Sequence, residues 1–202
     1  MWASFFLYYL NVLLFSPPTD AQLDRFLAAA AQSQYSYPEV GATMDGAIPK
    51  TYNVDHNRVL LGKGEALFHK AAFAFRDWKM FDLGWVRVYP AAPSTSIGEN
   101  VAVIARWSGL YFVNACRIVD TIHEHVPLAR FGFVYGTLQE HAERGEERFQ
   151  VEWNRHTDEV WYDILAFSQP NQLLPRIGYP FARRVQKRFA VDSKAAMVRA
   201  TS

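Results

Sequence analysis

The stretch RFGFVYGTLQEHAERGEERFQVEW, residues 130–153, predicts two neighbouring strands of an antiparallel sheet. Its first part, 130–138, is mostly aromatic residues and glycine. Its last part, 147–153, alternates: one side carries Phe149, Val151 and Trp153, and the other carries Arg148, Gln150 and Glu152. A period of two with one apolar face is typical of a half-buried strand. The charged segment EHAERGEE, residues 140–147, lies between the two parts and favours a solvated, salt-bridged connection.

Working outward, alternation and turn residues predict further strands at 52–61, 80–89, 101–107, 111–125 and 160–167. From residue 101 onward the connections between strands are short, which indicates antiparallel pairing because a parallel crossover needs a dozen residues. Helices are predicted at 20–33, 64–78 and 181–199, the first with a capping box at Thr19 and Gln22 and the last with Pro180 at its first position. The order predicts an α+β fold whose antiparallel sheet is covered by the long C-terminal helix, with a cavity between them.

The bulk composition narrows the class of protein. A length of 202 residues predicts one domain with a sizeable core. The net charge of +1 gives no field that would favour nucleic acid. The single cysteine, Cys116, excludes an intrachain disulfide framework and fits a reducing compartment, so a cytoplasmic location is expected. The sequence holds no P-loop, GxGxxG, GxSxG or HExxH pattern, and no cofactor is predicted.

The first fifteen residues are unusual because residues 2–15 carry no charge. The segment is shorter than the ~20 residues of a membrane-spanning helix and lacks the basic region of a secretory signal. We therefore expect an apolar N-terminal extension, 1–15, before a single domain, 16–202. The extension is expected to pack on the protein itself or on a second copy in a homodimer. Peripheral membrane contact, organelle targeting and a start site placed too far upstream are the alternatives.

Seven blocks in order resemble the DUF1990 (UPF0548) family: YPEVG (37–41), LGKGE (61–65), WKMF (78–81), NACRIV (114–119), GTLQEHAERGEERFQVEW (136–153), VWYDILAFS (160–168) and RFAVDS (188–193). The resemblance covers about residues 14–200, and the apolar start departs from it. The overall pattern also resembles the START/Bet v 1-like (SRPBCC) helix-grip proteins, which carry lipids, hormones or polyketides under a long helix. That resemblance implies an antiparallel sheet wrapped around the C-terminal helix, and by itself it transfers no function.

A carboxylate inside an apolar strand marks the candidate site. Asp163 shares a strand face with Trp161 and needs a partner or a raised pKa there. Arg117 is the expected partner, either as a structural ion pair or as part of an acid–base site. The expected ligand contacts under the helix are Asn114, Arg117, Tyr135, Trp161, Asp163, Phe181 and Val185.

Three further features have less specific interpretations. His141, Glu143 and Glu146 form H-x-E-x-x-E, a spacing that matches no established metal motif, so no metal is predicted and the residues are placed in the solvated connection or at a polar cavity rim. Cys116 is expected to be a buried, inert thiol. The basic side of the last helix favours a solvated face over a phosphate or anionic-lipid contact.

The leading functional hypothesis is the binding of a small hydrophobic, lipid- or polyketide-like molecule in the internal cavity. The main alternative is a cofactor-independent cyclase, hydratase or isomerase in the same cavity, with Asp163, Arg117 or His141 as its catalytic residues. The third hypothesis is a membrane-peripheral interaction protein that docks through residues 2–15.

Overall fold

The computed structural model describes residues 13–125, 128–139, 141–171 and 179–202. The elements in chain order are β1 (Leu13–Leu14), α2 (Asp20–Ala30), α3 (Ala42–Asp45), β2 (Asn53–Lys63), α4 (Glu65–Arg76), the 3-10 helix η1 (Lys79–Phe81), β3 (Val86–Tyr89), β4 (Asn100–Trp107), β5 (Leu110–Glu124), β6 (Ala129–Thr137), β7 (Glu143–Asn154), β8 (Glu159–Pro170) and α5 (Tyr179–Thr201). The predicted α+β order is confirmed.

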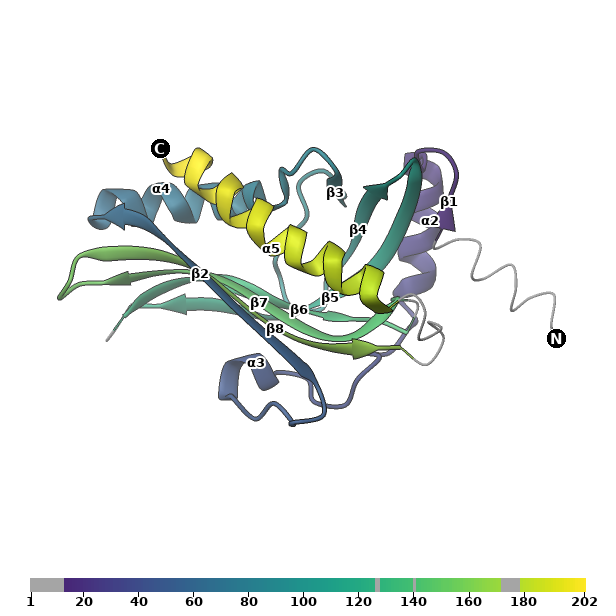
Figure 1. The fold of residues 1–202 in the computed structure, drawn as a ribbon, viewed down its shortest axis with the longest axis horizontal. Coiled ribbons are helices and arrows are strands. Elements are labelled where there is room, and N and C mark those ends of the chain that lie inside the picture. Colours follow the sequence, from purple (N-terminus) through teal and green to yellow (C-terminus); the bar gives the residue numbers. More distant parts are fainter. Residues whose placement is uncertain (1–12, 126–127, 140, 172–178) are drawn as a thin grey trace.

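One antiparallel sheet forms the body of the molecule, with its strands in the order β2-β8-β7-β6-β5-β4-β3 and β1 added beside β5. The long helix α5 crosses one face, and α3 lies against the other (Figure 1). We call the α5 side the inner face and the α3 side the outer face. The predicted helix-grip arrangement, a sheet wrapped around its C-terminal helix, is confirmed.

Aromatic side chains fill the inner face beneath the C-terminal half of α5. The Phe81 ring centroid lies 5.4 Å from that of Phe149 and 5.2 Å from that of Phe189 on α5. Tyr162 is fully buried, and its hydroxyl shares a 2.8 Å hydrogen bond with Ser193 of α5. Burying rings of this size provides most of the apolar area that stabilises the fold. This half of the helix is therefore fixed to the sheet.

Local signals in the sequence set most element boundaries. The predicted capping box of α2 is present, because Thr19 accepts from the Gln22 amide and the Gln22 side chain accepts from the Thr19 amide. The strand predicted at 80–89 is only partly correct, because Met80 and Phe81 belong to the 3-10 turn η1 and only Val86–Tyr89 is extended. Alternating apolar and charged residues fit a short helical turn on the core as well as a strand.

The prediction of a solvated connection at 140–147 is wrong. Strand β7 begins at Glu143, so most of the charged segment lies inside the sheet, and Glu143 and Glu146 are only 7% and 3% exposed. Gly145 makes this close pairing possible: its φ is 154°, and a Cβ there would lie 2.0 Å from the Phe167 carbonyl oxygen. The acids are buried because their partners come from distant parts of the sequence.

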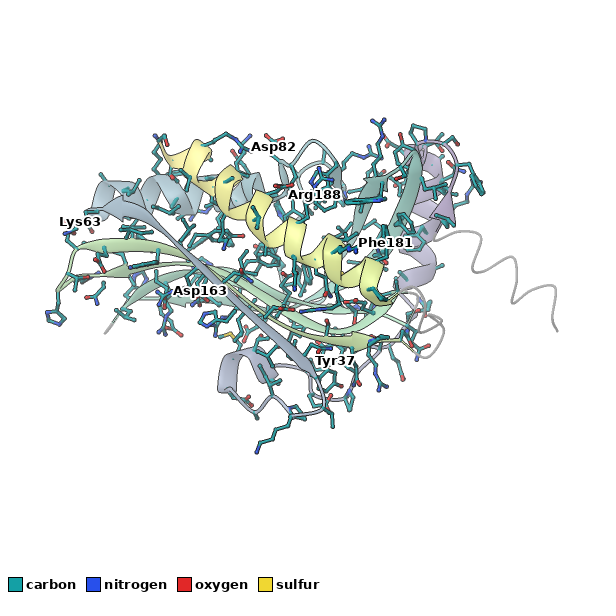
Figure 2. All side chains as sticks on the ribbon, viewed as in Figure 1. Tyr37, Lys63, Asp82, Asp163, Phe181 and Arg188 are labelled. Carbon is teal, nitrogen blue, oxygen red and sulfur yellow. The ribbon has the colours of Figure 1, made fainter. Side chains whose placement is uncertain are left out.

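Glu146 fixes the long segment before β2 to the outer face. Its carboxylate accepts hydrogen bonds from the Tyr37 hydroxyl (2.8 Å), the Gly41 amide (2.7 Å), the Thr43 amide (2.9 Å) and the Thr43 hydroxyl (2.5 Å). Figure 2 shows Tyr37 on the side of the sheet opposite Phe181 of α5. Every donor comes from more than a hundred residues earlier in the chain, so this single carboxylate closes a long loop.

The last residues of the apolar N-terminal segment pair with strand β5 of the sheet. Leu13 pairs with Phe112 and Leu14 with Tyr111, and Leu14 packs against the cluster that contains Leu23. The remaining residues of the predicted extension, 1–12, lie outside the described part of the chain. Within the described part, no helix has the length and hydropathy to cross a bilayer.

We expect Glu146→Gln to lower the free energy of unfolding by ~1–3 kcal/mol, because the amide cannot accept all four hydrogen bonds of a buried carboxylate. Urea denaturation measures the change. Glu99→Gln, at an exposed glutamate, is the matched control. Equal stability of the two variants would contradict a docking role for Glu146.

Candidate functional site

A carboxyl and a phenol meet on the inner face, beyond the aromatic core. Tyr135 of β6 and Glu147 of β7 lie opposite each other in the strand register, and the Tyr135 hydroxyl donates to Glu147 Oε2 at 2.8 Å. Burial raises the pKa of Tyr135 well above its usual range, so the phenol keeps its proton and remains a donor. Buried Cys116 lies close to the pair, and burial also raises the pKa of its thiol.

Glu147 is held in an environment that disfavours its charged form. Desolvation raises its pKa to about 7, the hydrogen bond from Tyr135 opposes this, and the nearby carboxylates of Asp55 and Glu143 add to it. The side chain nevertheless keeps some accessible surface. A group with this pKa can give or take a proton at neutral pH.

Glu143 extends the acidic character along β7. Its Oε2 accepts a hydrogen bond from the Gln186 side chain of α5, whereas its buried Oε1 has no hydrogen-bond partner among the described residues. Desolvation raises the pKa of Glu143, and its contacts with Ser168 and the charge of Arg183 partly offset the rise. An unsatisfied buried acceptor is costly and requires an explanation.

His141 is a neutral hydrogen-bond donor beside this cluster. Its Nδ1 accepts from the Glu143 amide at 2.9 Å, which assigns the ring proton to Nε2. Burial lowers the pKa of His141 to about 4, so the ring carries no charge at neutral pH. His141 can therefore donate a hydrogen bond through Nε2–H.

The N-terminal half of α5 and strands β4 and β5 provide an apolar wall. The Phe181 ring centroid lies 5.4 Å from that of Trp107 and 6.1 Å from that of Phe112. Val185 follows one turn later on the helix face that carries Phe189. The inward-pointing side chains that keep accessible surface here include Val103, Phe112, Asn114, Glu147, Phe181 and Val185. The described residues therefore leave the inner face less completely packed here than beneath the C-terminal half of α5.

The structure divides the seven expected ligand contacts between the two faces. Asn114, Tyr135, Phe181 and Val185 belong to the inner face. The outer face carries the other three, Arg117, Trp161 and Asp163, which therefore cannot line a space under α5. The prediction that these three side chains contact a ligand under α5 was wrong. Tyr162 faces α5, so Trp161 and Asp163, its neighbours in β8, point to the opposite face. Arg117 points toward α2.

The predicted pairing of Arg117 with Asp163 is also wrong. Arg117 donates to Asn100 Oδ1 at 2.8 Å and to the Ala30 carbonyl at 3.0 Å, which ties α2 to the sheet. Asp163 is 2% exposed and lies among three basic side chains. Its carboxylate lies 2.6 Å from His56 Nε2, 3.1 Å from Arg58 Nε and 3.2 Å from Arg148 Nη2. Asp163 thus serves as a structural ion-pair centre.

The H-x-E-x-x-E residues do not converge. Glu146 points to the outer face, whereas Glu143 points to the inner face and bonds Gln186 of α5. No group of three His, Cys, Asp or Glu side chains within the described residues is placed to hold a metal ion.

Glu147 is the candidate functional residue that the sequence prediction missed. The alternation of its own strand gave the signal. Glu147 lies an even number of residues from Phe149, Val151 and Trp153, so it shares their apolar face. A carboxylate at the end of an apolar stripe points into the core or to its edge. The expectation of a solvated connection concealed this signal.

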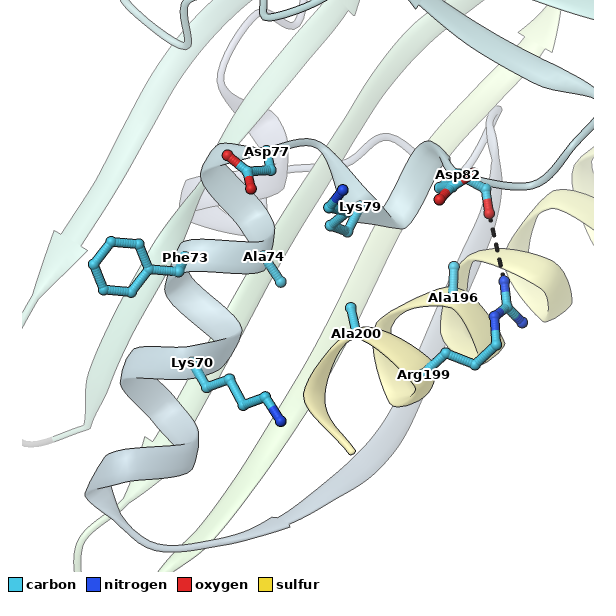
Figure 3. A pocket seen from close by; sticks show the side chains of 9 residues that line it. All are labelled: Lys70, Phe73, Ala74, Asp77, Lys79, Asp82, Ala196, Arg199 and Ala200. Carbon is cyan, nitrogen blue, oxygen red and sulfur yellow. Dashed lines mark hydrogen bonds between the residues drawn. The ribbon is translucent and has the colours of Figure 1, made fainter.

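A hollow of about 440 Å³ lies at the surface between α4, η1 and the C-terminal end of α5 (Figure 3). It is lined by Lys70, Phe73, Ala74, Asp77, Lys79, Asp82, Ala196, Arg199 and Ala200. Its acids and bases are mixed, and Arg199 donates to the Asp82 carbonyl at 3.4 Å. None of the residues that line this groove belongs to the Tyr135–Glu147 pair or to the N-terminal half of α5.

Comparison with known proteins places the chain among relatives that match nearly its whole length. The family described as "Domain of unknown function (DUF1990)" matches residues 36–196. A "UPF0548 protein" from Dictyostelium discoideum is 34% identical over 204 residues, which is 92% of this chain and 94% of the relative.

Solved structures are similar to this chain at low sequence identity. The hypothetical protein jhp0584 from Helicobacter pylori overlays with a TM-score of 0.50 at 14% identity, over 85% of this chain and 98% of that one. A norcoclaurine synthase point mutant from Thalictrum flavum overlays less closely, with a TM-score of 0.44 at 10% identity, over 75% of this chain and 96% of that one.

We expect Glu147→Gln to become more stable relative to the wild type as the pH rises from 5 to 8. The folded-state pKa of about 7 lies above the ordinary value of 4.5, so the folded wild type binds more protons than the unfolded chain between these values. The wild type therefore loses stability across this window, and the amide variant does not share this loss. Denaturation at each pH should show a relative shift on the order of 1–3 kcal/mol. A stability difference that is independent of pH would show that Glu147 titrates normally.

We expect Asp163→Asn to lower the free energy of unfolding by ~1–3 kcal/mol, because it leaves Arg58 and Arg148 without their shared carboxylate. Denaturant melts measure the loss, with Asp77→Asn at an exposed position as the control. Ligand binding on the inner face should be unchanged. A variant that kept its stability and lost binding would restore Asp163 as a site residue.

Proposed function

The chain belongs to the DUF1990 family, and we propose that it binds a small, largely apolar molecule between the inner face of its sheet and the N-terminal half of α5. The Tyr135–Glu147 pair is the polar anchor of this site. The observation that carries the proposal is the pair itself: a carboxyl with its pKa raised to about 7, hydrogen-bonded to a buried phenol on the sheet face that also carries Phe112 and meets Phe181. Binding sites of this kind are mostly apolar, with a few convergent polar groups and perturbed pKa values.

Packing differences along α5 support the location. Beneath the C-terminal half, the Phe81, Phe149 and Phe189 rings contact one another and leave little room. Beneath the N-terminal half, inward side chains such as Phe181 and Val185 remain partly accessible. Covering that apolar area with a ligand would be favourable by roughly 25 cal/mol per Å². A lipid- or polyketide-like molecule has the surface to do so.

A second candidate function is proton-transfer catalysis in the same place. A carboxyl with its pKa raised to about 7 is present in both protonation states near neutral pH, as a general acid or base should be. Tyr135 and the neutral His141 would supply hydrogen bonds to the reacting molecule. Glu147 thus takes the place of Asp163 and Arg117 as the leading acid–base candidate.

Filling the space with a large side chain tests the binding site. We expect Val185→Trp to weaken the binding of the neutral, apolar dye Nile red by roughly tenfold or more, because the indole occupies the volume that the dye needs. Fluorescence titration measures the affinity. Val191→Trp, at a position of the same helix that is 61% exposed, is the matched control. Equal dye binding by both variants would place the ligand elsewhere.

The variant Glu147→Gln distinguishes a protein that only binds its ligand from one that catalyses proton transfer. If the site only carries its ligand, small molecules incubated with the wild type should be recovered unchanged, as mass spectrometry will show. If the site transfers protons, the wild type should convert a component of a small-molecule extract, and the variant should bind that component without converting it.

A further inference from the structure

The charges around the anchor do not balance. Asp55, Glu143 and Glu147 all point to the inner face near the N-terminal half of α5, and their mutual repulsion contributes to the raised pKa of Glu147. Arg183 faces them, and it is engaged by Asp55 through both of its terminal nitrogens, one at 2.8 Å. Arg184 and Lys187, which follow on the helix, are exposed to solvent. Among the described residues, the charge of Arg183 therefore offsets the raised pKa of Glu143 only in part, and no ion pair includes Glu143 or Glu147.

The hydrogen-bond donors are also too few. Glu143 is 93% buried, since 7% of its surface is exposed, and its Oε1 accepts no hydrogen bond from the described residues. Glu147 has a single described donor, the Tyr135 hydroxyl. A buried carboxylate normally has its acceptor positions filled, because leaving one unfilled costs about 1–3 kcal/mol. Both the missing charge and the missing donors are properties that a ligand could supply.

Three kinds of polar group could reach these carboxyls. An anionic group would be repelled by the existing acids. A hydroxyl donates one hydrogen bond and supplies no charge. An ammonium group donates up to three hydrogen bonds and compensates the negative charge.

We propose that the bound molecule carries a basic nitrogen, whose ammonium group is held by Glu143 and Glu147 while its hydrocarbon part lies against β4, β5 and the N-terminal half of α5. This inference rests on the proposed binding function and adds the chemical class of the ligand: a lipophilic amine. The neutral His141 adds no positive charge that would oppose an ammonium group. Selectivity then follows from the uncompensated acids, and affinity follows from the apolar wall.

Three probes that have eight carbon atoms each and differ in their polar head group test the ligand class. Octylamine, octan-1-ol and octanoate are titrated into the full-length wild-type protein by isothermal titration calorimetry at pH 7.5. We expect octylamine to bind roughly tenfold or more tightly than octan-1-ol, and octanoate to bind most weakly. Equal affinity for octylamine and octan-1-ol would overturn the amine inference and leave the binding function intact. Failure of all three probes to bind would overturn both.

Variants show whether the selectivity arises at these two carboxyls. Glu143→Gln and Glu147→Gln should each lose most of the preference for octylamine over octan-1-ol, because a neutral amide cannot compensate the charge of an ammonium group. Glu99→Gln, at an exposed glutamate, should keep the full preference. Circular dichroism measures whether each variant is folded before it is titrated. If a variant does not fold, the comparison of octylamine with octan-1-ol in the wild type still tests the amine inference. A preference that survives in both site variants would contradict the assignment to Glu143 and Glu147.

The preference should also depend on pH. The titratable and charged groups that face Glu147 are Asp55 of β2, Cys116 of β5, Tyr135 of β6, Glu143 of β7, Tyr162 of β8 and Arg183 of α5, with His141 between β6 and β7. Between pH 6 and 8 Glu147 loses its proton, whereas an alkylammonium, like a lysine side chain with a pKa of ~10.4, stays charged. The ratio of octylamine to octan-1-ol affinity should therefore rise severalfold over this range. A ratio that falls with pH would contradict the proposal.

Discussion

The two-residue period of the central strands is the constraint on which the rest of the structure depends. Strand β7 lies between β6 and β8 and is covered by α5 on one side and by the α3 segment on the other. Successive side chains of β7 point to opposite faces, so each acidic residue can contact only groups that lie on its own face. Glu146 and Glu152 point outward, and Glu143 and Glu147 point inward. A shift of one residue would exchange the two sets and place Phe149 outside the core.

The acidic residues on the outer face have many hydrogen-bond and ion-pair partners, whereas those on the inner face have few. On the outer face, Glu146 accepts four hydrogen bonds and Glu152 lies 2.5 Å from Arg58 and 2.8 Å from Arg130. On the inner face, Glu147 has one described hydrogen-bond donor and Glu143 has a buried oxygen without any. Raising the pKa of Glu147 from 4.5 to about 7 costs the folded state on the order of a few kcal/mol when the group is charged. Complete pairing is typical of structural charges, whereas a cost of this kind is typical of binding and catalytic sites.

Most of the fold could be predicted from the sequence, because helix caps, alternation and short turns are local signals. The candidate site could be predicted only in part. Which face of β8 meets the helix is decided by packing, so the pattern around Asp163 could not distinguish an inner from an outer position. The partners of Glu146 lie more than a hundred residues away in the chain, and nothing in the charged segment itself indicates that it is buried. Glu147 could have been placed from its parity with Phe149.

Charge balance also separates the site from the other polar regions of the molecule. Asp163 has His56, Arg58 and Arg148 around it, so no charge remains there for a ligand to compensate. The surface groove beside α4 combines Lys70, Lys79 and Arg199 with Asp77 and Asp82, and it opens to solvent, where water satisfies both signs. Near Glu143 and Glu147 the described residues offer neither matching cations nor enough donors, and burial limits what water can supply. Because an unsatisfied buried charge is costly, this imbalance supports the proposal that a ligand binds on the inner face.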